Sequence, residues 1–154
     1  MRKVKYTERF ELDRPVARVF PLFSPEGEKL WVPGWDYENI LGSTQLHEDY
    51  VFLTKSHDHA AGDAVWLVKA YEPESHRVQF YKVEPGHKVG IITVHCLELG
   101  MSSTRVEVTY EYISLGPGGD EFLENFTASR YREFIGEWKT LLGRYFDSQG
   151  AYTA

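Results

Sequence analysis

Residues 120–146, DEFLENFTASRYREFIGEWKTLLGRYF, carry the longest helical pattern of the chain. Hydrophobic residues recur at intervals of three and four, which predicts one amphipathic helix over the whole stretch. Acidic residues gather at its start and basic residues near its end, as the helix dipole favours. The expected inward stripe consists of Leu123, Phe126, Arg130, Phe134, Trp138, Leu141 and Tyr145.

The sequence that precedes this helix predicts β-strands. Residues 3–12 alternate hydrophobic and polar side chains, which is typical of a half-buried strand. Short connections such as EPGH at 84–87 suit tight turns and therefore antiparallel neighbours. Six further strands are expected at 35–42, 50–54, 64–72, 76–84, 88–98 and 103–114. The sequence thus predicts a seven-stranded antiparallel sheet.

Two short helices are expected between the first two strands. In DRPVARVFPLF, residues 13–23, the first proline suits an opening helical turn and the hydrophobic residues have helical spacing. In SPEGEKLW, residues 24–31, the serine and proline have the form of a second helix start. These helices matter for the cavity argument below.

One helix cannot cover such a sheet. A helix of about 27 residues covers about 400 Å², whereas seven strands present about 870 Å² on one face. We therefore expect the sheet to curl around the helix and the short helices to close part of the opening. Such an arrangement favours an internal cavity that side chains fill only in part.

This order of elements resembles the START-like, or SRPBCC, superfamily. The resemblance rests on VFPLFSPEGEKLWVPGWD at 19–36, TRVEVTYEY at 104–112 and FTASRYREFIGEWKTLLGRYF at 126–146, and it extends from about residue 6 to residue 147. The stretch 20–36 is similar to bacterial proteins described as polyketide cyclase or dehydrase-like. The resemblance implies an α+β helix-grip fold, in which a curved seven-stranded antiparallel sheet wraps around a long C-terminal helix.

Composition narrows the possible functions. The 154 residues suit a single domain, 1–154, and aromatic residues reach 15%. A net charge of -6 argues against nucleic-acid binding. The single cysteine, Cys96, excludes an internal disulfide and is interpreted as a buried hydrophobic residue rather than a reactive thiol. No stretch is long and apolar enough for a membrane span, so a cytoplasmic location is expected.

Tryptophan and tyrosine residues are the main candidates for ligand contact. In the last strand, Val106, Val108, Tyr110 and Tyr112 share the face that should point at the long helix, and the two hydroxyls would then point inward. Trp66 is expected to face inward as well, although its strand is apolar on both sides.

Trp31 and Trp35 lie on either side of a break at Pro33-Gly34. This spacing places both indoles where the short helices meet the sheet, at the rim of the expected cavity. They would either close the mouth around an apolar ligand or only anchor the helix pair to the sheet.

Two polar residues leave alternatives open. Arg130, within the inward stripe, would either neutralise a carboxylate or enolate of a ligand, or reach the surface and pair with Glu133 or Glu8. His95 falls on the outward face of its strand and would become a general-base candidate only in the reversed register.

Other site chemistries find little support. The histidines of KSHDHAAGD, residues 55–63, have no third metal ligand fixed by spacing, and GPGGDE at 116–121 lacks the lysine and hydroxyl residue of a phosphate-binding loop. No nucleophile elbow or catalytic triad is recognisable, so catalytic residues stay unassigned, and no metal or cofactor is expected.

The leading hypothesis is a protein that binds a small, largely apolar ligand, such as a lipid, polyketide or aromatic compound, in an internal cavity. A polyketide cyclase or aromatase-like enzyme is the first alternative, and a co-chaperone-like interaction module the second. Superfamily members include all three kinds, because the fold does not determine the function. Exposed aromatic residues would also allow a homodimer.

Overall fold

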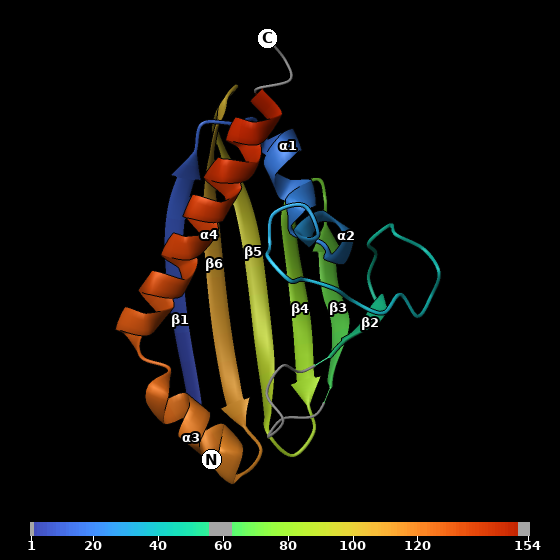
Figure 1. Ribbon diagram of the computed structural model, residues 1–154, viewed down its shortest axis with the longest axis vertical. Coiled ribbons are helices and arrows are strands. Elements are labelled where there is room, and N and C mark those ends of the chain that lie inside the picture. The colour runs from blue at the N-terminus through green and yellow to red at the C-terminus, as the bar shows by residue number, and fades with distance from the viewer. Residues whose placement is uncertain (1, 56–62, 151–154) are drawn as a thin grey trace.

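The structure, a computed structural model, describes residues 2–55 and 63–150 and contains one antiparallel sheet with its helices on one face (Figure 1). The strands are β1 (Lys3–Leu12), β2 (Val51–Thr54), β3 (Ala64–Glu72), β4 (Arg77–Glu84), β5 (Lys88–Gly100) and β6 (Ser103–Ser114). Their order in the sheet is β1-β6-β5-β4-β3-β2. The strands from β2 to β6 thus form the expected meander, and β1 pairs with β6.

The helices fall into two groups. Helix α1 (Val16–Val19), the 3-10 helix η1 (Phe20–Leu22) and α2 (Pro25–Glu28) follow β1, and α3 (Pro117–Asn125) and α4 (Ala128–Gly150) follow β6. Helix α4 packs on β1, whereas α1 packs on β5 and β6. The two groups leave part of the sheet between them without a helix above it (Figure 1).

The predicted strand at residues 35–42 is wrong, and the sheet has six strands among the described residues instead of seven. This segment makes only an isolated bridge, between Glu38 and Leu53. Its aromatic side chains bind α2 instead: the Trp35 indole donates to the Pro25 carbonyl at 2.8 Å, and the Tyr37 hydroxyl donates to Glu26 at 2.6 Å. The aromatic residues that predicted a strand are therefore used in contacts with a helix.

The predicted single helix at 120–146 is two helices, because the chain leaves helical geometry at Phe126. Thr127 then caps α4, since its hydroxyl oxygen accepts from the Arg130 backbone N–H at 3.2 Å. The inward stripe of α4 lies one position from the predicted one, except at Trp138, which belongs to both. Its buried residues are Tyr131, Ile135, Trp138, Leu142 and Phe146.

The inward face of the sheet changes character along the strands. At one level the aligned residues Val78, Val94 and Val108 are fully buried and apolar. Further along, the aligned residues are Trp66, Lys82, Gly90 and Tyr112, and the last level holds Glu84, Lys88 and Ser114. The apolar core therefore lies at one end of the sheet, and charged groups face inward at the other end.

Candidate ligand-binding cavity

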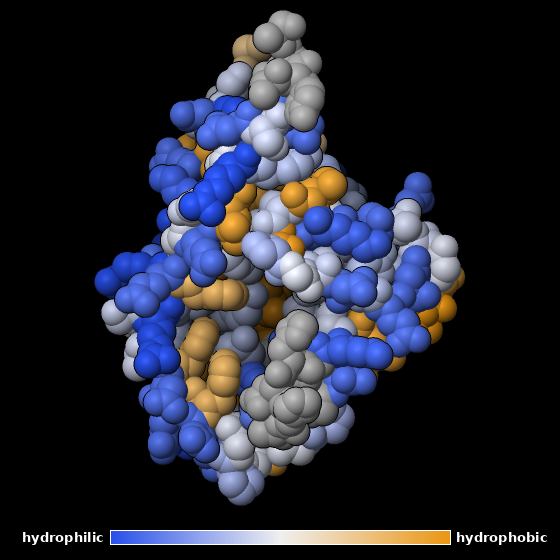
Figure 2. Space-filling model, in the orientation of Figure 1, coloured by the Kyte–Doolittle hydropathy of each residue, from blue (hydrophilic) through white to orange (hydrophobic). Residues whose placement is uncertain are grey.

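A cavity of about 930 Å³ opens beside the polar end of the inward sheet face. Figure 2 shows a hollow on the face that carries the helices, with hydrophobic surface inside it. The lining residues come from the loop after α2, from β2 and β3, from the end of β4, from the β4–β5 turn and from α3. They include Val32, Trp35, Tyr37, Thr54, Ala64, Trp66, Lys82, Glu84, His87, Lys88 and Phe122.

One wall of the cavity is aromatic. Trp66 faces inward, as predicted, and stacks on Phe52 with ring centroids 5.3 Å apart. Phe80 and Trp35 meet the same indole edge-on at 6.0 and 5.9 Å. The Trp66 N–H donates to the Thr54 hydroxyl at 2.9 Å. This network fixes the indole orientation, so that the wall offers an apolar face without an unsatisfied donor.

Trp31 and Trp35 have different positions relative to the cavity. Trp31 is buried, donates to the Leu22 carbonyl at 2.9 Å, and packs on Trp138 at 5.5 Å. Trp35 is half-buried, lines the cavity and donates to the Pro25 carbonyl. Both indoles therefore anchor the short helices through their N–H groups, and Trp35 also presents a surface to the cavity.

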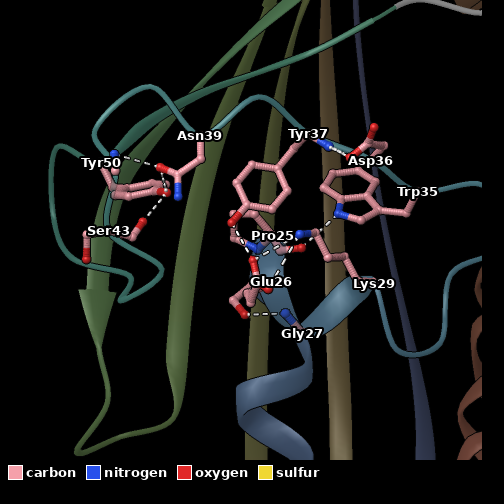
Figure 3. Close-up of polar contacts among 12 residues, drawn as sticks. Pro25, Glu26, Gly27, Lys29, Trp35, Asp36, Tyr37, Asn39, Ser43 and Tyr50 are labelled. Carbon is pink, nitrogen blue, oxygen red and sulfur yellow. Dashed lines mark hydrogen bonds and ion pairs between the residues drawn. The ribbon is translucent and has the colours of Figure 1, made fainter.

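A polar cluster holds α2 at the rim of the cavity (Figure 3). The Ser24 hydroxyl caps α2 by accepting from the Gly27 N–H at 2.9 Å. The hydrogen bond from Tyr37 lowers the pKa of Glu26, while burial and the nearby Glu26 raise the pKa of Tyr37. Lys29 lies over the Tyr37 ring, 5.0 Å from its centroid. The loop after α2 is thus tied back onto the helix it leaves.

Tyr110 and Tyr112 lie on the inward face of β6, as predicted, and both are buried. Neither hydroxyl has a hydrogen-bond partner among residues 2–55 and 63–150, yet no polar side-chain atom sealed from water in these ranges lacks one. The two hydroxyl oxygens are therefore not completely sealed from water. Tyr131 differs, because its hydroxyl donates to the Val108 carbonyl at 2.6 Å. Burial, with neighbouring tyrosines and Glu28, raises the pKa of Tyr110 well above its ordinary value.

Glu28, at the end of α2, is a site residue that the sequence analysis missed. Burial raises the pKa of its carboxyl to about 8, and Lys82 opposes this shift. The carboxyl makes no hydrogen bond or ion pair within the described part of the chain. Glu28 is half-buried, and its charge acts on the Tyr110 hydroxyl, so the end of α2 lies within electrostatic reach of β6.

A charged cluster at the end of β4 was also missed. Glu84 is only 5% exposed and Lys88 only 6%. The Lys88 ammonium lies 3.1 Å from a Glu84 carboxylate oxygen and 4.0 Å from the Phe122 ring centroid. Lys82 and His87 each approach Glu84 at 3.5 Å. The sequence contained a signal for this cluster. Lys82 and Glu84 follow Phe80 at intervals of two along β4, so all three side chains lie on the same, inward face of the strand.

The remaining candidates lie outside the large cavity. Val108 is fully buried beneath Tyr131. Phe126 and Arg130 line a separate groove of about 440 Å³ next to α3, and the Arg130 side chain is exposed, with no ion pair among the described residues. His95 faces outward, as expected, and lines a groove on the opposite face of the sheet.

Cys96 is 2% exposed, and burial raises its pKa to about 12. Because only the thiolate reacts, we expect the native thiol to react with a disulfide reagent such as DTNB about a thousandfold more slowly than the thiol of the unfolded chain. Stopped-flow absorbance in buffer and in denaturant measures both rates. Rapid labelling of the native protein would contradict the interpretation of Cys96 as a buried hydrophobic residue.

Within residues 2–55 and 63–150, no three histidine, cysteine, aspartate or glutamate side chains form a group suited to a metal ion. His57 and His59, considered above as metal ligands, lie outside the described residues. No helix in the described ranges has the length and hydropathy needed to cross a membrane.

Comparison with known proteins gives the fold. No family model and no curated protein matches the chain. Norcoclaurine synthase from Thalictrum flavum, in complex with dopamine and hydroxybenzaldehyde, is similar with a TM-score of 0.66 and 12% identity over 99% of this chain and 88% of that one. A START superfamily protein from Mycobacterium smegmatis has a TM-score of 0.60 and 12% identity over 97% of this chain and 99% of that one.

A third similar structure is the di-domain ARO/CYC BexL from the BE-7585A biosynthetic pathway. Its TM-score is 0.65 at 13% identity, over 93% of this chain and 47% of the di-domain protein. All three similarities extend over nearly the whole of this chain. The chain therefore has a START-like fold, which confirms the resemblance inferred from the sequence.

Proposed function

We propose that the protein binds a small, largely apolar ligand with an aromatic or acyl body inside the cavity. The observation that carries this proposal is the aromatic wall of that cavity, formed by Trp35 and Trp66, whose ring centroids lie 5.9 Å apart. The hydroxyls of Tyr110 and Tyr112 make no hydrogen bond within residues 2–55 and 63–150, so they are suited to water or a ligand oxygen. The volume of about 930 Å³ is within the range of small-molecule sites.

The proposal assigns contacts to four of the predicted residues. Trp35 and Trp66 would pack on the body of the ligand, and Tyr110 and Tyr112 would donate hydrogen bonds to it. Trp31 and Val108 would support the site from behind, since both are buried in the core. The groove at Phe126 and Arg130 is separate and smaller, and we propose no ligand contact there.

A cyclase-like enzyme is the second candidate, and a specific arrangement favours it. Lys82 lines the cavity and its charge acts on the carboxyl of Glu28, which in turn acts on the hydroxyl of Tyr110. Such groups can move protons or polarise a carbonyl of a bound chain. Phenylalanine at Tyr110 would abolish turnover by an enzyme, would only weaken a binder, and would leave an interaction module unaffected.

Native mass spectrometry of the freshly purified protein, compared with its mass after denaturation, is the direct test. A retained small molecule of defined mass would support the proposal and give the ligand's composition. Isothermal titration with nonpolar aromatic probes then covers ligands that are lost during purification. Absence of both retained and added ligands would reject the cavity as a binding site.

Filling the cavity should abolish uptake of a fluorescent probe with an apolar aromatic body, such as the anion 1-anilinonaphthalene-8-sulfonate. Ala64 lines the cavity and is buried, so a phenylalanine there would project into the space beside Trp66. The matched control is Val65→Phe, which changes the opposite, 38% exposed face of the same strand. We expect loss of probe fluorescence in Ala64→Phe and full uptake in Val65→Phe, with circular dichroism showing that both are folded. Equal uptake would place the probe elsewhere.

A further inference from the structure

We propose that the cavity binds an apolar carboxylic acid, whose carboxylate is held by the ammonium group of Lys82. This inference rests on the proposed binding of an apolar ligand and adds to it the chemical class of the head group. The observation that carries it is the position of Lys82, which lines the cavity close to both the Glu84 carboxylate and the Trp66 ring.

The strand register directs Lys82 toward the cavity. Lys82 lies two residues after the inward-facing Phe80 on β4, and it aligns with Gly90 on β5 and, one strand further, with Tyr112 on β6. A Cβ atom at Gly90 would lie only 2.9 Å from Cε1 of Tyr112, so the glycine leaves room for this ring beside the lysine. The Lys82 side chain is 28% exposed, and its ammonium can therefore meet a ligand.

Lys82 has hydrogen-bonding capacity that the protein does not use. An ammonium group carries three N–H donors. The Lys82 ammonium lies 3.5 Å from Oε1 of Glu84, which is a long ion pair, and it makes no hydrogen bond among residues 2–55 and 63–150. The centroid of the Trp66 ring is 5.3 Å away, a contact that stabilises the charge without using a donor in a conventional hydrogen bond. Lys82 can therefore donate to an oxygen of the ligand.

The neighbouring Lys88 reduces the competition from Glu84. Oε2 of Glu84 lies 3.1 Å from Nζ of Lys88, and both side chains are buried. Nδ1 of His87 accepts from the same ammonium at 3.1 Å, since an ammonium can only donate. Two ammonium groups thus share the Glu84 carboxylate, and Lys88 is the closer of the two. The charge of Lys82 is only partly neutralised as a result.

The other charged groups near the cavity leave this positive charge in place. Burial raises the pKa of Glu28 to about 8, so its carboxyl is protonated at neutral pH even though the charge of Lys82 acts on it. Four further charged residues line the cavity, and all are exposed, so water and salt screen them: Asp36, Glu38, Lys55 and Asp63. A carboxylate on the ligand therefore complements the charge at Lys82.

The aromatic wall defines the other half of the ligand. Trp35 and Trp66 both line the cavity, and their rings meet edge-on with centroids 5.9 Å apart. A carboxylate oxygen held by Lys82 would lie about 2.8 Å from its Nζ atom. The carbon skeleton attached to the carboxylate would then lie beside Trp66. The ligand class that fits is an apolar carboxylic acid that is ionised at neutral pH.

Three probes with the same naphthalene body test the head group. They are 2-naphthylacetate, which is an anion, 2-naphthylacetamide, which is neutral, and 2-(2-naphthyl)ethylamine, which is a cation. Isothermal titration calorimetry at pH 7 measures their affinities. We expect the acetate to bind at least tenfold more tightly than the amide, because hydrogen bonds between charged groups are the stronger ones, and we expect the amine to bind most weakly.

Lys82→Met removes the ammonium and keeps a long side chain. It should weaken binding of the acetate about tenfold and leave binding of the amide within about twofold. The matched control is Lys69→Met, which removes an ammonium that lies 5.0 Å over the Tyr81 ring on the outer face of the sheet. This control should leave the affinities for all three probes unchanged.

Glu84→Gln distinguishes a ligand site from an ion cluster with a purely structural role. It removes the carboxylate that competes for Lys82, so the acetate should bind about fivefold more tightly, whereas a structural role predicts no gain. Circular dichroism shows whether this variant is folded. If it is not, the comparison of Lys82→Met with Lys69→Met decides the question by itself.

The possible outcomes separate this inference from the proposed function. Equal affinities for the acetate and the amide, or tightest binding of the amine, would overturn the carboxylate site while leaving the apolar cavity intact. A preference for the acetate that persists in Lys82→Met would also overturn it. Failure of all three probes to bind would reject the proposed ligand-binding function itself.

Discussion

Replacing Trp31 with alanine should lower the free energy of unfolding by about 3–5 kcal/mol. The indole is 5% exposed, and its ring packs edge-on against both Phe23 at 5.8 Å and Trp138 at 5.5 Å. Truncation leaves a void at the junction of α2 and α4 and leaves the Leu22 carbonyl, which accepts the indole N–H, without its partner. Urea denaturation followed by circular dichroism measures the change.

Trp35→Ala is the matched comparison, because Trp35 makes the same kind of hydrogen bond to Pro25 but is only half-buried. We expect a cost of about 1–2 kcal/mol for it, and a larger effect on probe binding than on stability. Trp31→Phe should lie between the two, since it keeps a ring and loses the donor. Equal costs for Trp31→Ala and Trp35→Ala would show that the two indoles anchor the short helices equally.

The sequence predicted the parts of the fold where a local pattern and the tertiary contacts agree. The alternation in β6 is unbroken, and its inward residues are the predicted ones. The strand predicted at 35–42 is absent because Trp35 and Tyr37 bond to Pro25 and Glu26 of α2, and no local pattern indicates these contacts. The predicted helical stripe lies one position from the buried one, except at Trp138, and the interruption at Phe126 was not predicted.

The candidate site was harder to predict, for a physical reason. A sequence pattern assigns charged residues to the surface, because an isolated buried charge is costly. Glu84 and Lys88 escape this rule by pairing with each other at 3.1 Å, and Glu28 escapes it by keeping its proton. The Glu84–Lys88 pair joins residues four positions apart across the β4–β5 turn, whereas the environment of Glu28 depends on residues distant in the sequence, such as Lys82. The alternation of inward and outward side chains along β4 could have indicated that Glu84 faces inward. No local pattern indicated that Glu28 is buried.

Glu28 should also give the protein a distinctive dependence of stability on pH. Its folded-state pKa of about 8 lies above the ordinary value of 4.5, so between these values the folded chain holds a proton that the unfolded chain has lost. The stability that Glu28 contributes is therefore complete below pH 4.5, and it falls as pH rises through the window up to about pH 8. The steepest slope is about 1.4 kcal/mol per pH unit.

Measured against Glu28→Gln, which cannot titrate, the wild type should lose roughly 3–4 kcal/mol of unfolding free energy between pH 5 and pH 9. Urea denaturation of both proteins at several pH values gives this difference, in which contributions common to both cancel. Glu133→Gln, which removes an exposed carboxyl on α4, serves as the control and should follow the wild-type profile. A constant difference between wild type and Glu28→Gln would mean that the Glu28 carboxyl is ionised throughout and that its pKa is not raised by folding.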